Sequence, residues 1–129
     1  MITTRELSPG VIEITIAAKK YGQAGEHWRQ VLAGRNQGGY GQIYIQRFGA
    51  NKRRYWSCYE MRDYYRGSKG ANLDECPGAM FIWTGEKEAH VEALDAIDNQ
   101  ALGRELGAAL RKYEQKDERD LWEVKFRFV

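Results

Sequence analysis

The sequence predicts an α+β fold, in which a single mixed or antiparallel β-sheet of about five strands carries helices on one face. Two segments, residues 11–16 and 121–129, alternate between apolar and polar side chains as half-buried strands do. Two others, residues 24–32 and 86–113, repeat apolar side chains at helical spacing. The predicted order of elements along the chain is β-α-β-β-β-α-β. With 129 residues, we expect one compact domain that spans residues 1–129.

The first third of the chain contains a predicted strand and a predicted helix. Residues 1–10 are interpreted as a leader that ends in a Ser-Pro-Gly turn. The strand follows directly, because three isoleucines share one of its faces: Ile12, Ile14 and Ile16. The glycines at positions 22 and 25 interrupt this pattern, and a helix of about three turns follows them. One face of this helix is apolar and comprises Ala24, Trp28, Val31 and Leu32.

The segment from Gly38 to Lys69 is the most aromatic and most basic part of the chain. It holds six of the eight tyrosines, and seven Lys and Arg against two acids, so its net charge is +5 where the whole chain has +2. Residues 41–48 and 54–61 alternate as two strands, and the five residues between them have the composition of a turn. We therefore predict a β-hairpin with a basic tip.

The rest of the chain is predicted as a loop, a strand, a helical region and a last strand. Residues 63–78 are expected to form a long loop, since they include three glycines and a proline. The continuous apolar run at residues 79–83 predicts a strand that is buried on both faces and central in the sheet. A helical period begins at Glu86, and its second part carries one apolar stripe of Leu102, Leu106, Leu110 and Tyr113. The closing strand places Trp122, Val124, Phe126 and Phe128 on one face.

The predicted hairpin would present an aromatic face with a basic rim. Single-stranded nucleic acid is bound by surfaces of this kind, since bases stack on aromatic rings and cations neutralise phosphates. The sequence thus favours a non-enzymatic module that binds single-stranded RNA or DNA through a basic, Tyr-rich hairpin. The residues assigned to this surface are Tyr44, Phe48, Lys52, Arg53, Arg54, Tyr55, Tyr59, Arg62 and Arg66.

A protein partner is the alternative, because tyrosine and arginine are also common at protein interfaces. The chain would then be a small inhibitor or adaptor, of the kind made by phages and mobile elements, that acts on a protein that handles nucleic acid. An acidic stripe on the helix after Glu86 would contact such a basic partner, although a solvent-facing helix surface has the same pattern: Glu88, Glu92 and Asp95. The tyrosines could equally pack as a second core layer or form the contact of a homodimer.

The sequence contains no convincing catalytic or metal-binding pattern. Its two histidines and two cysteines lack the close pairing of structural zinc ligands: His27, Cys58, Cys76 and His90. No nucleophile signature surrounds either cysteine, so a hydrolase that uses Cys76 or His90 is the least supported alternative. We therefore expect no metal, no cofactor and no enzymatic activity.

No window of the sequence approaches the roughly 18 consecutive apolar residues of a membrane span. The first residues also lack the basic and apolar regions of a secretory signal. We expect a cytoplasmic protein with no membrane partner, whose cysteines are kept reduced.

Overall fold

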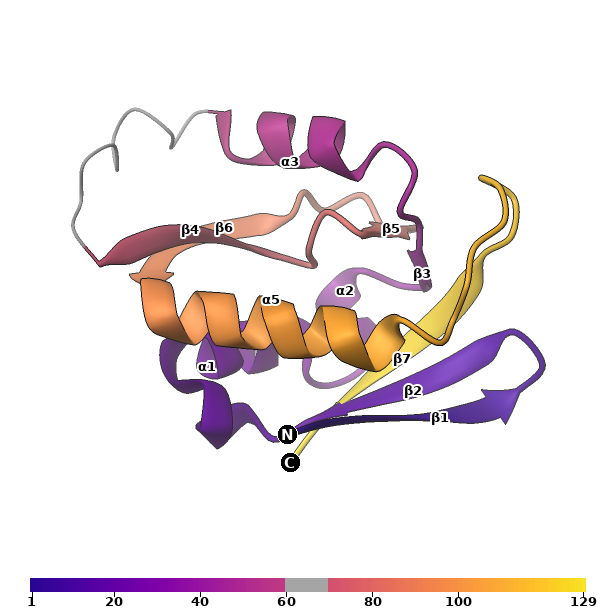
Figure 1. Ribbon diagram of the computed structural model, residues 1–129, viewed down its shortest axis with the longest axis horizontal. Coiled ribbons are helices and arrows are strands. Elements are labelled where there is room, and N and C mark those ends of the chain that lie inside the picture. The colour runs from indigo at the N-terminus through magenta and orange to yellow at the C-terminus, as the bar shows by residue number, and fades with distance from the viewer. Residues whose placement is uncertain (60–69) are drawn as a thin grey trace.

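The computed structural model describes residues 1–59 and 70–129 and has an α+β architecture (Figure 1). A five-stranded mixed sheet has the order β1 (Ile2–Ser8), β2 (Val11–Ile16), β7 (Trp122–Phe128), β3 (Ile43–Ile45) and β5 (Phe81–Trp83). A second, antiparallel sheet pairs β4 (Ala71–Cys76) with β6 (His90–Asp95). The helices of the described residues are η1 (Ala18–Tyr21), α1 (Gly22–Leu32), α2 (Asn36–Gly39), α3 (Ala50–Ser57) and α5 (Ala96–Leu110). The predicted α+β class is confirmed, with a two-stranded sheet added to the expected one.

Strand β7 is the centre of the five-stranded sheet. It runs parallel to β2 and antiparallel to β3, so Val124 lies opposite Ile12 on one side and Ile43 on the other. All three side chains are fully buried. The alternation that predicted this strand therefore reflects one apolar face of the sheet, which burial stabilises by roughly 1.5–3 kcal/mol per large side chain.

Helices α1 and α5 bury their apolar stripes in the same core as the sheet. Leu102, Leu106 and Leu110 are at most 3% exposed, and Tyr113 beyond the helix end is also buried. These residues confirm the stripe predicted for this region. Other large core side chains come from α1 and from the start of β5, among them Trp28, Leu32 and Phe81.

The β4–β6 ribbon runs between α3 on one side and α1 and α5 on the other (Figure 1). Figure 1 also shows the two chain ends side by side. Backbone hydrogen bonds hold them there, from Ala17 N to Met1 O at 3.1 Å and from Ala18 N to Val129 O at 3.2 Å. None of the helices in the described part of the chain is long and apolar enough to cross a membrane.

The predicted leader is wrong, because residues 2–8 form strand β1. This strand pairs antiparallel with β2 and places Ile2 opposite Ile16. The Ser-Pro-Gly turn was correctly recognised, and it connects two strands rather than ending a leader. Gly22 and Gly25, expected to precede the first helix, lie inside α1.

The predicted hairpin is also wrong. Its first strand is only Ile43–Ile45. Residues 54–57 of its second strand belong to helix α3 instead, and residues 60 and 61 lie outside the described residues. Gly49 has a φ of +79°, a left-handed conformation that glycine adopts without strain, and α3 begins at the next residue. The alternation of residues 54–57 did not indicate a strand, because none of these side chains is buried.

Three further expectations need correction. Residues 71–76, expected in a loop, form β4, while residues 63–69 of that loop lie outside the described residues. The strand at 81–83 is an edge strand rather than a central one, since it pairs only with β3. Residues 90–95 form β6 rather than the start of a helix, and the side chain of Asp95 caps α5 by accepting a hydrogen bond from Asp98 N.

Candidate functional site

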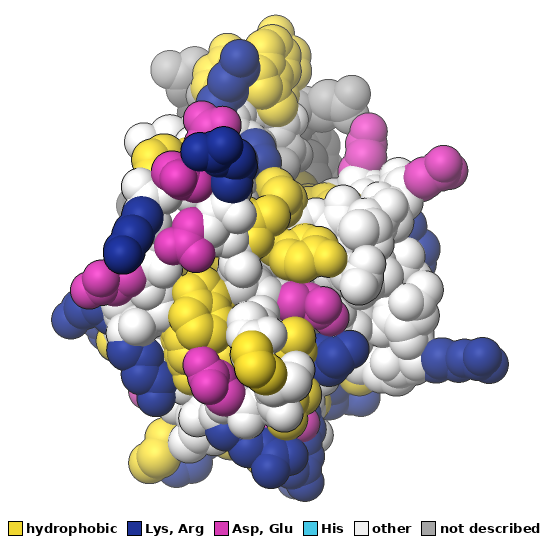
Figure 2. Space-filling model, turned by 90° about the vertical axis from the view of Figure 1, so that its right-hand side faces the viewer, with side chains coloured by type: hydrophobic (Ala, Val, Ile, Leu, Met, Phe, Trp, Pro, Cys, Tyr) yellow, Lys and Arg dark blue, Asp and Glu magenta, His cyan; other side chains and the backbone are white. Residues whose placement is uncertain are grey.

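Helix α3 and the residue pair after it expose a cluster of aromatic rings. Tyr55, Trp56 and Tyr59 are 42%, 61% and 55% exposed, and their ring centroids lie 5.2 to 5.8 Å apart. No residue of Ala50–Ser57 is buried. Figure 2 shows hydrophobic side chains projecting at the top of the molecule, over α3, with basic side chains beside them. We call Tyr55, Trp56 and Tyr59 the aromatic cluster.

Basic side chains, rather than apolar ones, attach α3 to the body of the protein. Arg53 donates to three backbone carbonyls, those of Ala79 (2.9 Å), Phe48 (2.8 Å) and Gln46. Burial lowers the pKa of Arg53 from its usual value. Arg54 Nε lies 3.2 Å from Oε1 of the buried Glu75. Arg53 therefore faces the protein while the rings face the solvent, and the side chain of Arg54 remains 70% exposed.

We expect Arg53→Ala to lower the free energy of unfolding by about 2 kcal/mol, because it leaves partly buried carbonyls without their charged donor. Urea denaturation followed by fluorescence measures this change. Lys52→Ala is the matched control, since Lys52 is an exposed neighbour, and should change stability by less than about 0.5 kcal/mol. Equal losses in the two variants would contradict the anchoring role of Arg53.

A groove of about 990 Å³ lies next to the aromatic cluster. Trp56 and Tyr59 line one side, and Trp83 and Phe81 of β5 are also part of its lining. Carboxylates contribute as well, among them Glu75. The Oε2 atom of Glu75 is buried and accepts no hydrogen bond from any described residue. The groove thus combines apolar surface with acceptor groups.

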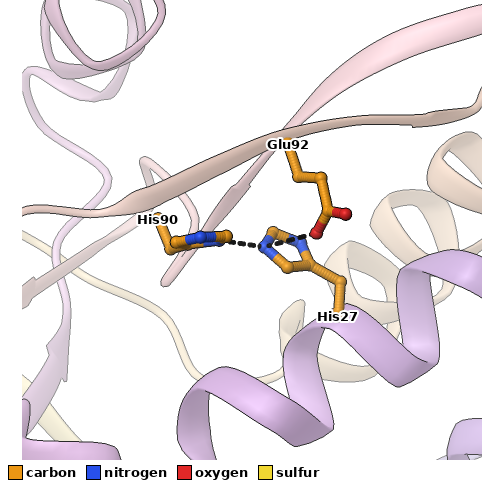
Figure 3. Close-up of side chains that lie close together, drawn as sticks. All are labelled: His27, His90 and Glu92. Atoms are coloured by element: carbon orange, nitrogen blue, oxygen red, sulfur yellow. Dashed lines mark hydrogen bonds and ion pairs between the residues drawn. The ribbon is translucent and has the colours of Figure 1, made fainter.

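A second cluster lies between β6 and α1. His27 of α1 places its Nε2 atom 2.7 Å from Nδ1 of His90 and 3.6 Å from Oε2 of Glu92. Figure 3 shows the two β6 side chains pointing toward His27. His90 and Glu92 are two residues apart on the strand and therefore share a face. His27 is buried, whereas His90 and Glu92 are exposed, so the cluster opens to solvent on one side.

Asp74 of β4 orients His27 from the buried side. Its Oδ2 lies 2.6 Å from His27 Nδ1, and Trp28 Nε1 donates to the same oxygen at 3.1 Å. A carboxylate that faces two ring nitrogens accepts from both, so the proton of a neutral His27 is on Nδ1. The lone pair of Nε2 is then directed at His90 and Glu92. Carboxylate–histidine pairs of this kind orient metal-binding and proton-transferring imidazoles alike.

The two cysteines add no reactive group to either cluster. Both are buried, and they form no disulfide with each other. Cys76 lies opposite His90 in the β4–β6 ribbon, but burial raises the pKa of its thiol well above the usual range. A thiol in this environment is a poor nucleophile.

The chain matches no protein-family model and no curated protein sequence. Its function is therefore inferred from the two clusters alone.

The structure brings together only part of the predicted binding surface. Phe48 precedes α3 and is 44% exposed, and the residues on or next to the helix are Lys52, Arg53, Arg54, Tyr55 and Tyr59. Tyr44 is half-buried on β3, on the face opposite Ile43 and Ile45. Arg62 and Arg66 lie outside the described residues.

The predicted acidic stripe does not exist, because its residues are not on a helix. Glu88 precedes β6, Glu92 points from β6 toward His27, and Asp95 caps α5. The spacing i, i+4, i+7 forms one face only at 3.6 residues per turn, and on a strand Glu92 and Asp95 point to opposite faces.

Sequence reasoning missed two features of the site. Trp56 was not among the residues assigned to the binding surface, although it is the most exposed ring of the aromatic cluster. His27 and His90 are 63 residues apart, and nothing local indicates that they meet. The sequence His90-Val91-Glu92 was a usable signal, since a strand places the first and third side chains on one face.

Proposed function

We propose that this chain is a non-enzymatic binding module that docks on another protein through the aromatic cluster and the adjoining groove. One observation carries the proposal: α3 and Tyr59, two residues beyond its end, expose three mutually contacting rings while Arg53 holds the helix in place. Burying such rings against the core would stabilise the protein by roughly 1.5–3 kcal/mol each. Exposed rings on a fixed helix are typical of an interface in its unbound state.

The charges around the cluster favour a protein over nucleic acid. Arg53 and Arg54 are engaged with carbonyls and with Glu75, and Arg47 donates to the carbonyls of Tyr113 and Leu110. The described residues that line the groove include three cations and two carboxylates, Glu75 and Glu88, and two of the cations, Arg53 and Lys87, already donate to backbone carbonyls. A protein partner can instead donate N–H groups to those carboxylates and place an apolar side chain among the rings.

The aromatic cluster supplies the central contact, because tryptophan and tyrosine carry much of the binding free energy at protein interfaces. Rings that already touch one another lose little conformational freedom on binding. The groove beside them accepts the side chain that anchors the partner. This arrangement suits the inhibitor or adaptor class predicted as the alternative from the sequence.

Single-stranded nucleic acid is the second candidate, and one observation favours it. Helix α3 carries no acidic residue, and its exposed Lys52 lies on the same helix as the rings. Bases would stack on Trp56 and Tyr59 in this case. The two candidates differ in salt dependence, since log K for single strands falls by about 0.7 per unit of log salt for each phosphate neutralised.

The protein-docking proposal is tested with Trp56→Ala and a matched control. Ile97 is 77% exposed on α5 and does not line the groove, so Ile97→Ala removes an exposed apolar side chain elsewhere. A partner captured by the wild-type chain should bind Ile97→Ala equally and bind Trp56→Ala at least about 30-fold more weakly. Isothermal titration calorimetry of that partner measures the difference. Urea denaturation should show unchanged stability in both variants.

Three outcomes contradict protein docking. Labelled single strands that bind at micromolar concentration, and release steeply as salt rises, would support the nucleic-acid candidate instead. A concentration-dependent dimer seen by sedimentation and lost in Trp56→Ala would identify a second copy of the chain as the occupant. Equal binding by Trp56→Ala and Ile97→Ala would remove the aromatic cluster from any interface.

A further inference from the structure

The cluster of His27, His90 and Glu92 has a chemistry that protein docking does not use. Two imidazole nitrogens and one carboxylate oxygen converge, and all three atoms lie within 4.8 Å of one another. They come from α1 and β6, two elements far apart in the sequence (Figure 3). We propose that they bind a divalent transition metal ion, Zn²⁺ in particular, at a three-ligand site with an open coordination position.

The donor atoms fit zinc by type and by number. Zinc accepts imidazole nitrogen and carboxylate oxygen, and sites with three protein ligands keep a fourth position for water. Purely oxygen-binding ions such as Mg²⁺ and Ca²⁺ are disfavoured by two imidazoles. His90 and Glu92 are exposed, which leaves solvent access to the fourth position.

The distances require only a small movement of exposed side chains. Zinc–nitrogen bonds of 2.0–2.1 Å at a tetrahedral angle place two ligand nitrogens about 3.3 Å apart. His27 Nε2 and His90 Nδ1 are 2.7 Å apart, and His27 Nε2 and Glu92 Oε2 are 3.6 Å apart. An outward shift of the exposed His90 ring by about half an ångström therefore brings the two nitrogens to the separation they have on zinc, and the exposed Glu92 carboxylate, within 4.8 Å of both, closes the remaining distance by rotation. The buried His27 stays where it is.

The proton arrangement is compatible with metal binding. Asp74 holds the Nδ1 proton of His27, so Nε2 already presents a lone pair. His90 Nδ1 must donate in the metal-free hydrogen bond, because two lone pairs do not bind each other. On metal binding that proton moves to Nε2 of His90 and Nδ1 becomes a ligand, with no net release of protons from a neutral ring. The Asp74–His27 pair is the outer carboxylate contact that metal-binding histidines usually have.

The test is calorimetric titration of ZnCl₂ into the full chain after EDTA treatment and dialysis. We expect one equivalent to bind with micromolar or lower Kd, and saturating Zn²⁺ to raise Tm by about 5–10 °C. His90→Ala and Glu92→Gln each change one exposed ligand, and each should weaken Zn²⁺ binding by about 10-fold to 100-fold. Glu86→Gln, an exposed glutamate outside the cluster, is the matched control and should bind as the wild type does.

Cobalt provides an independent readout of the ligands. Co²⁺ bound to the wild-type chain should give visible absorption bands with the intensity of tetrahedral coordination and no thiolate charge-transfer band. The Glu86→Gln variant should give the same spectrum. Circular dichroism checks that His90→Ala retains the fold. Glu92→Gln removes a carboxylate ligand with almost no change in side-chain size. Three results would overturn the site: no saturable binding below about 100 μM, ligand variants that bind like the wild type, or a cysteine signature in the cobalt spectrum.

Discussion

Asp74→Ala is expected to lower the free energy of unfolding of the metal-free protein by about 3–5 kcal/mol. The Asp74 side chain is 7% exposed and is the acceptor for both His27 Nδ1 and Trp28 Nε1. Alanine leaves these two buried donors without a partner, and each unsatisfied donor costs about 1–3 kcal/mol. Asp74 also links β4 to α1, so its loss loosens the ribbon against the helix. Urea denaturation at constant m-value measures the change.

Asp74→Asn shows how much of the lost stability comes from the missing acceptor and how much from the missing side-chain volume. Both donors reach the same oxygen, Oδ2, so an asparagine amide oxygen in its place can accept from both with its two lone pairs, although without the negative charge, and should cost less than alanine. His27→Ala combined with Asp74→Ala should lose less than the sum of the single changes, because the two residues share one interaction. A loss below about 1 kcal/mol in Asp74→Ala would show that the Asp74–His27 pair does not stabilise the fold.

The elements that the sequence predicted well are those whose pattern is buried in the core. Strands β2 and β7 and helices α1 and α5 have apolar stripes that contact one another, so their periodicity reports the environment in which they fold. Each pattern is complete within a single segment. The α+β class followed from these elements alone.

The errors fall on segments whose structure depends on distant residues. Helix α3 has no buried side chain, and Arg53 attaches it to carbonyls of Gln46, Phe48 and Ala79, which no periodicity reveals. Strand β6 was assigned to a helix because the three-residue spacing of Val91 and Leu94 is helical, and the partner strand is not known from the sequence. That partner, β4, was itself interpreted as a loop.

The two candidate sites also differ in how far the sequence predicts them. The aromatic character of residues 48–59 is local, so the exposed Phe48, Tyr55 and Tyr59 were identified from sequence even with the wrong secondary structure. The histidine cluster is not local, since α1 supplies one ligand and β6 supplies two. Its orienting carboxylate, Asp74, comes from a third element. Only the packing of β4 and β6 against α1 brings these groups together.

Gly25→Ala is expected to destabilise the protein by at least about 2 kcal/mol, although alanine is the better helix former. Gly25 lies inside α1, where a Cβ atom would be 2.0 Å from the carbonyl oxygen of Ala18 and 2.8 Å from its carbonyl carbon. The obstacle is backbone, so no side-chain rotation relieves it. Moving η1 away would expose Ala18 and Tyr21, which are 5% and 2% exposed. Thermal and urea denaturation measure the loss.

Gly107→Ala is the matched control, because Gly107 also lies inside a helix, α5, and has no atom within 4 Å of the added Cβ. Here the higher helix propensity of alanine acts alone, and we expect a gain of up to about 1 kcal/mol. The same substitution therefore has opposite signs in α1 and α5, and the difference measures the contact between η1 and α1. Stabilisation by Gly25→Ala would mean that η1 does not pack on α1 at this position, and the close approach of Ala18 to the helix would have to be abandoned.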